Sequence, residues 1–112
     1  MTITEEFHGK VCVLGLKGSF MGEPEATLFQ ERKFQLLEKD HVNIVLDLSE
    51  MTMINSSGLG SVISALVSIR DRGGDLRLAR LNSTIHFVIQ KVQLDRIFRV
   101  FKTVEEAVSS FE

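Results

Sequence analysis

The amino-acid sequence predicts an α/β domain with a mixed β-sheet, on three observations. Two strand-like segments flank the expected tight turn His8-Gly9-Lys10, which indicates an antiparallel hairpin at the N-terminus. Short apolar runs then alternate with stripes at helical spacing, a pattern typical of βα units with parallel strands. A length of 112 residues with 44% hydrophobic content suits one modest core. We therefore expect residues 1–112 to form one domain, with helices packed on the sheet.

The expected strands are short runs rich in apolar and β-branched residues. They cover residues 2–8, 11–16, 42–48, 76–81 and 97–101. Ile44-Val45-Leu46 is apolar on both faces of its strand, so that strand should be internal in the sheet. The crossovers that carry helices should be right-handed.

The expected helices have recognisable start and stop signals. They run from Pro24 to about residue 39, from about 57 to 70, from Asn82-Ser83 to about 92, and from Thr103 to the C-terminus. Pro24 suits a helix start, and Gly73 suits a helix end because glycine adopts the left-handed conformation readily. Asn82 is a candidate N-cap. Thr103 with Glu106 three residues later forms a capping-box pattern.

The chain is organised around residues 47–66, where a strand ends, a short hydrophobic loop crosses and a helix begins. Leu59, Val62, Ile63 and Leu66 stand at i, i+3, i+4 and i+7, so this stripe should face the sheet. Serines at the helix start lie near unpaired backbone N–H groups and the positive end of the helix dipole. We expect Ser57 to cap the helix and Ser56 to point into solvent or a partner. A phosphate at this position would be stabilised by the same groups.

The same segment resembles the signature of the STAS domain, in particular that of the bacterial anti-sigma-factor antagonists. The matching residues are Asp47-Leu48-Ser49, Met53-Ile54 and Asn55-Ser56-Ser57-Gly58-Leu59-Gly60. The order of strands and helices along nearly the whole chain also matches this family. The resemblance implies a single STAS domain, which agrees with the α/β architecture expected from the apolar pattern.

The resemblance also implies a mechanism of partner switching. In the family, the serine after the motif's acidic residue is phosphorylated, and that position is Ser56 here. The implied partner is an anti-sigma factor that is also a serine kinase with a histidine-kinase-like ATPase fold. The unphosphorylated antagonist binds this kinase and frees the sigma factor, and a metal-dependent serine phosphatase removes the phosphate. The domain itself would not be an enzyme.

Two positions depart from the family pattern. Asn55 replaces the motif's aspartate, and Met21 stands where the loop after the second strand usually carries an aspartate. Both changes remove negative charge from the region that should face the kinase and its nucleotide. The alternative hypothesis is therefore a STAS scaffold or regulatory subunit that binds a partner without being phosphorylated.

The predicted partner-binding surface surrounds this serine loop. Two glycines in one helical turn are unfavourable by propensity, so either close packing on the sheet or the approach of a partner must explain them. A stripe of small residues, Ser61, Ser64, Ala65 and Ser68, forms either a solvated face or a flat docking surface. The candidate contact residues are Met21, Asn55, Ser56, Ser57, Gly58, Leu59, Gly60, Ser61 and Ser64.

Other functions lack support in the sequence. The three histidines fall in unrelated contexts without metal-ligand spacing, and residues 58–63 match no dinucleotide or phosphate-loop motif. We expect no cofactor, no metal and no catalytic residue. A net charge of −2 gives no basic footprint for nucleic acid. No membrane span or signal peptide is evident, and Cys12 in a strand-like run reads as a buried apolar residue, so a cytoplasmic location is expected.

Overall fold

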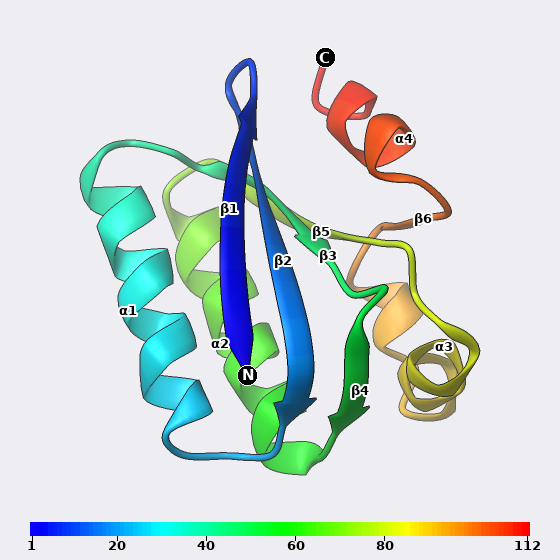
Figure 1. The fold of residues 1–112 in the computed structure, drawn as a ribbon. Helices are drawn as coiled ribbons and strands as arrows, with labels where there is room; N and C mark the ends of the chain where they lie inside the picture. Colours follow the sequence, from blue (N-terminus) through cyan, green and yellow to red (C-terminus); the bar gives the residue numbers. More distant parts are fainter.

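A six-stranded mixed sheet runs through the centre of the molecule (Figure 1). The computed structural model describes residues 1–112. The strands are β1 (Thr2–His8), β2 (Val11–Phe20), β3 (Asn43–Asp47), β4 (Met51–Ile54), β5 (Asp75–Ala79) and β6 (Val100–Phe101). The main order is β1-β2-β3-β5-β6, and β4 pairs with the second half of β2. Only β1 is antiparallel to its neighbour.

Four helices cover the sheet. They are α1 (Glu25–Glu38), α2 (Ser56–Asp71), α3 (Ser83–Lys91) and α4 (Val104–Ser109), with a 3₁₀ turn at Leu94–Arg96. In Figure 1, α1 and α2 lie together beside the hairpin, whereas α4 lies on the other side of the sheet and α3 packs near β4. None of these helices is both long enough and apolar enough to cross a bilayer.

The strands divide their side chains between two cores with the period of two that pleating imposes. Ile44 and Leu46 of β3 join the larger core with the buried residues of α1, α2 and α3, while Val45 between them joins the smaller core under α4. The predicted internal position of this strand is confirmed, because β3 pairs with β2 on one side and β5 on the other.

Both predicted N-caps in the second half of the chain are confirmed. The side chain of Asn82 accepts a hydrogen bond from the backbone N–H of Ile85 at 3.0 Å. The hydroxyl of Thr103 accepts one from the backbone N–H of Glu106, also at 3.0 Å. Each satisfies a donor that the first helical turn would otherwise leave unpaired.

The predicted strand boundaries are wrong in three places. The expected hydrophobic loop contains the strand β4, which four residues without regular alternation do not reveal. β2 continues to Phe20 rather than ending at Leu16, because its second half pairs with β4 across a register shift after Gly18. β6 begins only at Val100, since the residues before it form a turn that buries Leu94 and Phe98.

Candidate functional site

The serine loop lies at the junction between β4 and α2, and Asn55 is the residue that joins them. Its side-chain oxygen accepts a hydrogen bond from the backbone N–H of Gly58 at 3.0 Å, so Asn55 is the N-cap of α2. The expectation that Ser57 caps the helix is wrong. The helix begins one residue earlier than predicted, which makes Ser56 and Ser57 its first two residues.

The other end of the Asn55 amide binds the loop that follows β2. Its Nδ2 donates a hydrogen bond to the carbonyl oxygen of Met21 at 2.9 Å. The Asn55 backbone N–H donates to the carbonyl of Phe20 at 3.3 Å. One amide thus caps a helix and fastens a second loop beside it. A carboxylate at this position could accept from Gly58 but could not donate to Met21.

Both serine side chains of the loop are free. Ser56 and Ser57 are exposed, and neither hydroxyl takes part in a hydrogen bond within the protein. The first turn of α2 contains no acidic residue. The predicted phosphate acceptor therefore stands at the positive end of a 16-residue helix with no negative side chain in that turn.

The two glycines of the motif have different surroundings. A Cβ atom on Gly58 would lie 2.3 Å from the carbonyl oxygen of Phe20 and 2.8 Å from Cγ1 of Ile54, so close packing on the sheet requires glycine there. A Cβ atom on Gly60 would meet nothing within 4 Å. Packing within the protein therefore explains why Gly58 is a glycine. It does not explain Gly60, which is exposed.

The face of α2 that meets the core is close to the predicted one. Val62 and Leu66 are buried, and Leu59 and Ile63 are partly buried against the same core. Gly58, Ala65 and Ile69 complete the buried face.

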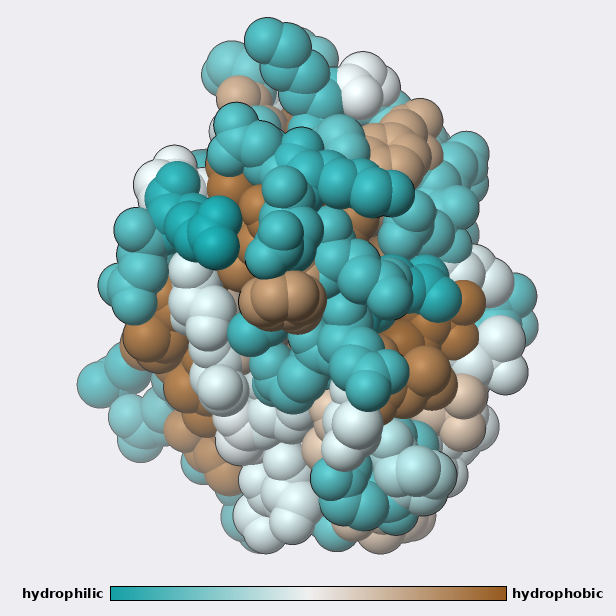
Figure 2. Space-filling model, turned by 90° about the vertical axis from the view of Figure 1, so that its left-hand side faces the viewer, coloured by the Kyte–Doolittle hydropathy of each residue, from teal (hydrophilic) through white to brown (hydrophobic).

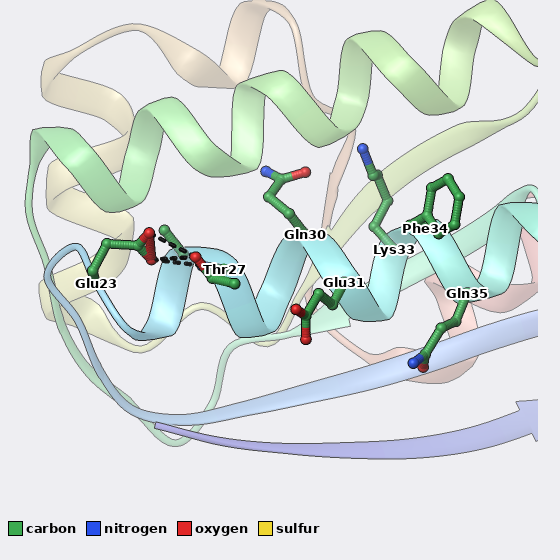
Figure 3. A pocket seen from close by; sticks show the side chains of 8 residues that line it. Glu23, Thr27, Gln30, Glu31, Lys33, Phe34 and Gln35 are labelled. Carbon is green, nitrogen blue, oxygen red and sulfur yellow. Dashed lines mark hydrogen bonds between the residues drawn. The ribbon is translucent and has the colours of Figure 1, made fainter.

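The stripe of small residues on α2 is not a free surface, so that expectation is wrong. Ala65 is fully buried, and α1 lies along the stripe. Gln30 of α1 donates to the backbone and hydroxyl oxygens of Ser61 at 2.8 and 2.9 Å, and Lys33 lies 3.3 Å from the hydroxyl of Ser68. Figure 3 shows both side chains reaching from α1 toward α2. Ser64 is the exposed member of the stripe.

Two exposed methionines flank the serine loop. Met21, a predicted contact residue, is 42% exposed on the loop after β2, and Met53 of β4 is 52% exposed. Met53 belongs to the motif but is not among the predicted contacts. No local sequence signal marks it, because its exposure depends on the pairing of the four-residue strand β4 with β2. Methionine side chains adapt to many partner surfaces.

A shallow hollow of about 510 Å³ follows α1 from Glu23, close to the serine loop, to Phe34 and Gln35 (Figure 3). The face that carries α1 is mostly hydrophilic, with separate apolar patches (Figure 2). Hydrogen bonds from the side chain and backbone of Thr27 hold the pKa of the Glu23 carboxyl below its usual range. That carboxylate is engaged with Thr27 rather than directed at a ligand.

The remaining reactive side chains make structural contacts or are buried in the core. Asp47 accepts a hydrogen bond from the backbone N–H of Ser49 at 3.1 Å and pairs with Arg80 at 3.3 Å. Burial, with a smaller contribution from Glu5, raises the pKa of the Cys12 thiol to about 12. No three side chains among His, Cys, Asp and Glu come together in a way that could hold a metal ion.

Comparison with known proteins agrees with this fold. The STAS domain model matches residues 2–107. A putative anti-sigma factor antagonist from Thermotoga maritima is 34% identical over 84 residues, which is 74% of each chain. The crystal structure of a putative anti-sigma factor antagonist from that organism superimposes with a TM-score of 0.88 at 28% identity, covering 96% of this chain and 92% of the other.

A more distant solved structure shares the same fold. The unphosphorylated form of the anti-sigma factor antagonist SpoIIAA gives a TM-score of 0.74 at 17% identity, with 98% of this chain and 97% of that chain covered. A family match across almost the whole chain and a relative above 30% identity agree with the strand order and the helix arrangement described above. The chain belongs to the STAS domain family.

Proposed function

We propose that this protein is an anti-sigma-factor antagonist that works by partner switching. In its unphosphorylated form it binds an anti-sigma factor that is also a serine kinase with a histidine-kinase-like ATPase fold. Phosphorylation of Ser56 ends that binding, and a metal-dependent serine phosphatase restores it. The partners, not this chain, carry out both reactions, so the protein itself is not an enzyme.

The observation that carries the proposal is the free, exposed serine pair on a rigidly held helix start. The Asn55 side chain fixes the loop by hydrogen bonds to Met21 and Gly58, so the serine hydroxyls are not needed for internal hydrogen bonds and stay exposed. Around them lie the exposed Met21 and Met53 and the bare backbone of Gly60. An adaptable apolar rim beside an uncovered helical turn suits the approach of a protein partner.

The chemistry of the switch is a reversible phosphoryl transfer. The kinase would move the γ-phosphoryl group of ATP to Oγ of Ser56, giving ADP and releasing the hydroxyl proton. The phosphatase would use water to return serine and inorganic phosphate. The added group carries about −1.5 to −2 charges, which an interface fitted to a neutral hydroxyl would meet with repulsion and desolvation. A loss of about 1.4 kcal/mol is already tenfold in affinity.

The switch should act on the interface rather than on the fold. A phosphate on Ser56 would sit at the first helical position, where the unpaired N–H groups and the dipole of α2 favour negative charge. The phosphorylated protein is therefore expected to remain folded with α2 intact. Partner release would come from charge at the contact surface.

A second candidate function is that of a scaffold or regulatory subunit that binds a partner and is never phosphorylated. The observation that favours it is the Asn55 amide, which spans two loops in a way that the family's aspartate could not. On this hypothesis the same surface, including Ser57, Leu59 and Ser64, serves as a constant docking site.

A binding experiment on the full chain tests the proposal. The histidine-kinase-like serine kinase encoded nearest to this gene is titrated with wild-type protein, Ser56→Ala, Ser56→Asp and Ser83→Asp, in the presence of ADP. We expect wild type and Ser56→Ala to bind alike and Ser56→Asp to bind at least tenfold more weakly. Ser83→Asp adds the same charge at the exposed first position of another helix, α3, and serves as the matched control. Equal binding by Ser56→Asp and wild type would contradict the proposal.

A further inference from the structure

The charges of this chain are distributed very unevenly along the sequence. Eight of the 13 Lys and Arg residues lie between residues 70 and 102, and only three of the 15 Asp and Glu residues lie there. Residues 70–102 are therefore strongly basic, although the whole chain has a net charge of −2. In the fold, this segment runs from the C-terminal end of α2 to the edge strand β6.

Two clefts meet at that edge strand. One, of about 650 Å³, is lined by Arg70, Arg96 and Arg99 together with the turn before β6. The other, of about 400 Å³, is lined by Arg80, Lys102, His86 and the loop after β5. The two clefts share three residues, which are Asp95, Val100 and Phe101. They therefore form one basic region with β6 between its halves.

Three of the five cations in this region are not neutralised by the protein. Arg70 pairs with Asp75 and Arg80 pairs with Asp47. Arg96, Arg99 and Lys102 are exposed and take part in no ion pair. The guanidinium carbon of Arg99 lies 5.3 Å from the ring centre of Phe101, a contact that orients this arginine without cancelling its charge.

The strand between the clefts has an open edge. β6 pairs with β5 alone, through the carbonyls of Arg99 and Phe101, which accept hydrogen bonds from Leu78 and Arg80. Because alternate residues of a strand in a parallel ladder serve opposite neighbours, the N–H and C=O of Val100 face the open side. The opposite edge of the sheet, β1, carries Glu5 and Glu6 instead.

We propose that this basic edge, formed by Arg96, Arg99, Lys102 and the backbone of Val100, binds an extended acidic segment of a partner protein. The segment would lie beside β6 as an added strand, with its carboxylates on the free cations. The open backbone edge of β6 can pair with a polypeptide strand but not with a nucleic acid, which favours a protein partner. Val100 and Phe101, both partly buried, favour apolar side chains between the acidic ones. This contact is separate from the serine loop.

A designed peptide tests the proposal on the full chain. The probe is a fluorescein-labelled peptide of ten alternating glutamate and valine residues, and anisotropy measures its binding. We expect saturable binding that weakens as salt is raised, and a shift of the Val100 amide resonance on addition of unlabelled peptide. Arg96→Glu/Arg99→Glu should weaken binding at least tenfold. Lys10→Glu/Lys39→Glu changes the charge equally, away from both clefts, and should change binding less than twofold.

Two further probes separate this proposal from its alternatives. The same peptide with N-methyl groups along one edge should bind at least fivefold more weakly, because it cannot pair with β6 as a strand. Ser56→Asp should bind the unmodified peptide like wild type, so the outcome does not depend on the switch. Absence of saturable binding, full binding by Arg96→Glu/Arg99→Glu, or equal binding of the N-methyl peptide would overturn the proposal. Displacement by tripolyphosphate together with full N-methyl binding would instead identify a site for small anions.

Discussion

The side-chain amide of Asn55 donates a hydrogen bond to the carbonyl oxygen of Met21 at 2.9 Å while its oxygen caps α2 on Gly58. Asn55, which stands where the family pattern has an aspartate, therefore uses both the NH₂ group and the oxygen of its amide in structural contacts. The Met21 side chain is exposed and only its backbone is used, so the two departures from the family pattern meet in one contact.

This contact predicts how Asn55 variants behave. Asn55→Ala should lower the free energy of unfolding by about 1–2 kcal/mol, the sum of a lost cap and a lost hydrogen bond. Asn55→Asp keeps the cap but sets a carboxylate against the Met21 carbonyl, so a loss of about 1 kcal/mol is expected at pH 7. Protonation gives the carboxyl a donor, so this deficit should shrink at acidic pH. Urea unfolding of both variants from pH 7 to pH 4 measures the effect, and a pH-independent deficit for Asn55→Asp would contradict it.

The two glycines of the motif, Gly58 and Gly60, predict opposite effects of the same substitution. Gly58→Ala should destabilise the protein by about 1–3 kcal/mol, because the added methyl group collides with the backbone of Phe20. Gly60→Ala meets open space in a helix and should stabilise the free protein by about 0.5–1 kcal/mol. Thermal unfolding measures both. If the kinase approaches this turn, Gly60→Ala should nevertheless bind it more weakly, and unchanged kinase binding would remove Gly60 from the contact surface.

The Asp75 carboxylate predicts a pH dependence of stability. Burial alone would raise its pKa, but hydrogen bonds from Arg77 at 2.9 Å and Arg70 at 3.0 Å outweigh that effect and hold the pKa below its usual range. A lowered pKa in the folded state contributes stability above the unfolded value of about 3.9, and this contribution is lost as pH falls through the folded value. Asp75→Asn should cost about 1–2 kcal/mol at pH 7.

Denaturant unfolding across pH 2 to pH 7 tests this assignment. The difference between wild type and Asp75→Asn should be constant near neutrality and shrink below about pH 4. Asp71→Asn removes the same charge from an exposed position without an ion pair, so it should leave the stability curve nearly unchanged. A difference for Asp75→Asn that grows toward acid would mean that its carboxylate does not stabilise the folded state.

The thiol of Cys12 should be inert in the native protein. It is fully buried on β2, which lies between β1 and β3, and burial raises its pKa to about 12, so almost no thiolate forms at pH 8. Iodoacetamide should therefore label the chain only as fast as it unfolds, and labelling should become rapid in denaturing urea. Mass spectrometry follows the adduct, and rapid labelling without urea would contradict the burial.

The elements that the sequence predicts well are those whose signals are local. The Asn82 and Thr103 caps and the internal strand at Ile44–Leu46 are confirmed because capping residues and apolar runs identify them directly. The predicted cap of α2 is misplaced because asparagine and serine at neighbouring positions are all good caps. The end of β4 determines which of these residues becomes the cap, and β4 itself is too short to be predicted from the sequence.

The candidate site is predicted only in part, because some of its features depend on contacts between segments far apart in the sequence. Periodicity shows that α2 has an apolar face and a small-residue face, but it does not show that α1 covers the second one. Gln30 and Lys33 make that contact from a helix more than 25 residues away in the sequence, where no local pattern links them to Ser61 or Ser68. Met53 escapes prediction as a contact because its exposure depends on the pairing of β4 with β2.

Phosphorylation should also leave the fold intact. Because the phosphate would sit at the positive end of α2, phosphorylated protein should unfold at a temperature no lower than that of the unmodified protein. Differential scanning calorimetry of the two forms compares them directly. A melting temperature several degrees lower after phosphorylation would mean that the switch works by disrupting the loop held by Asn55.

The location of the phosphate tests the central claim most directly. The chain is incubated with its cognate kinase and ATP, and tandem mass spectrometry locates the modification in wild type, Ser56→Ala and Ser57→Ala. We predict one phosphate, on Ser56, in wild type and Ser57→Ala, and none in Ser56→Ala. Phosphate on Ser57, or no phosphate on either serine while the kinase still binds the chain, would contradict the account.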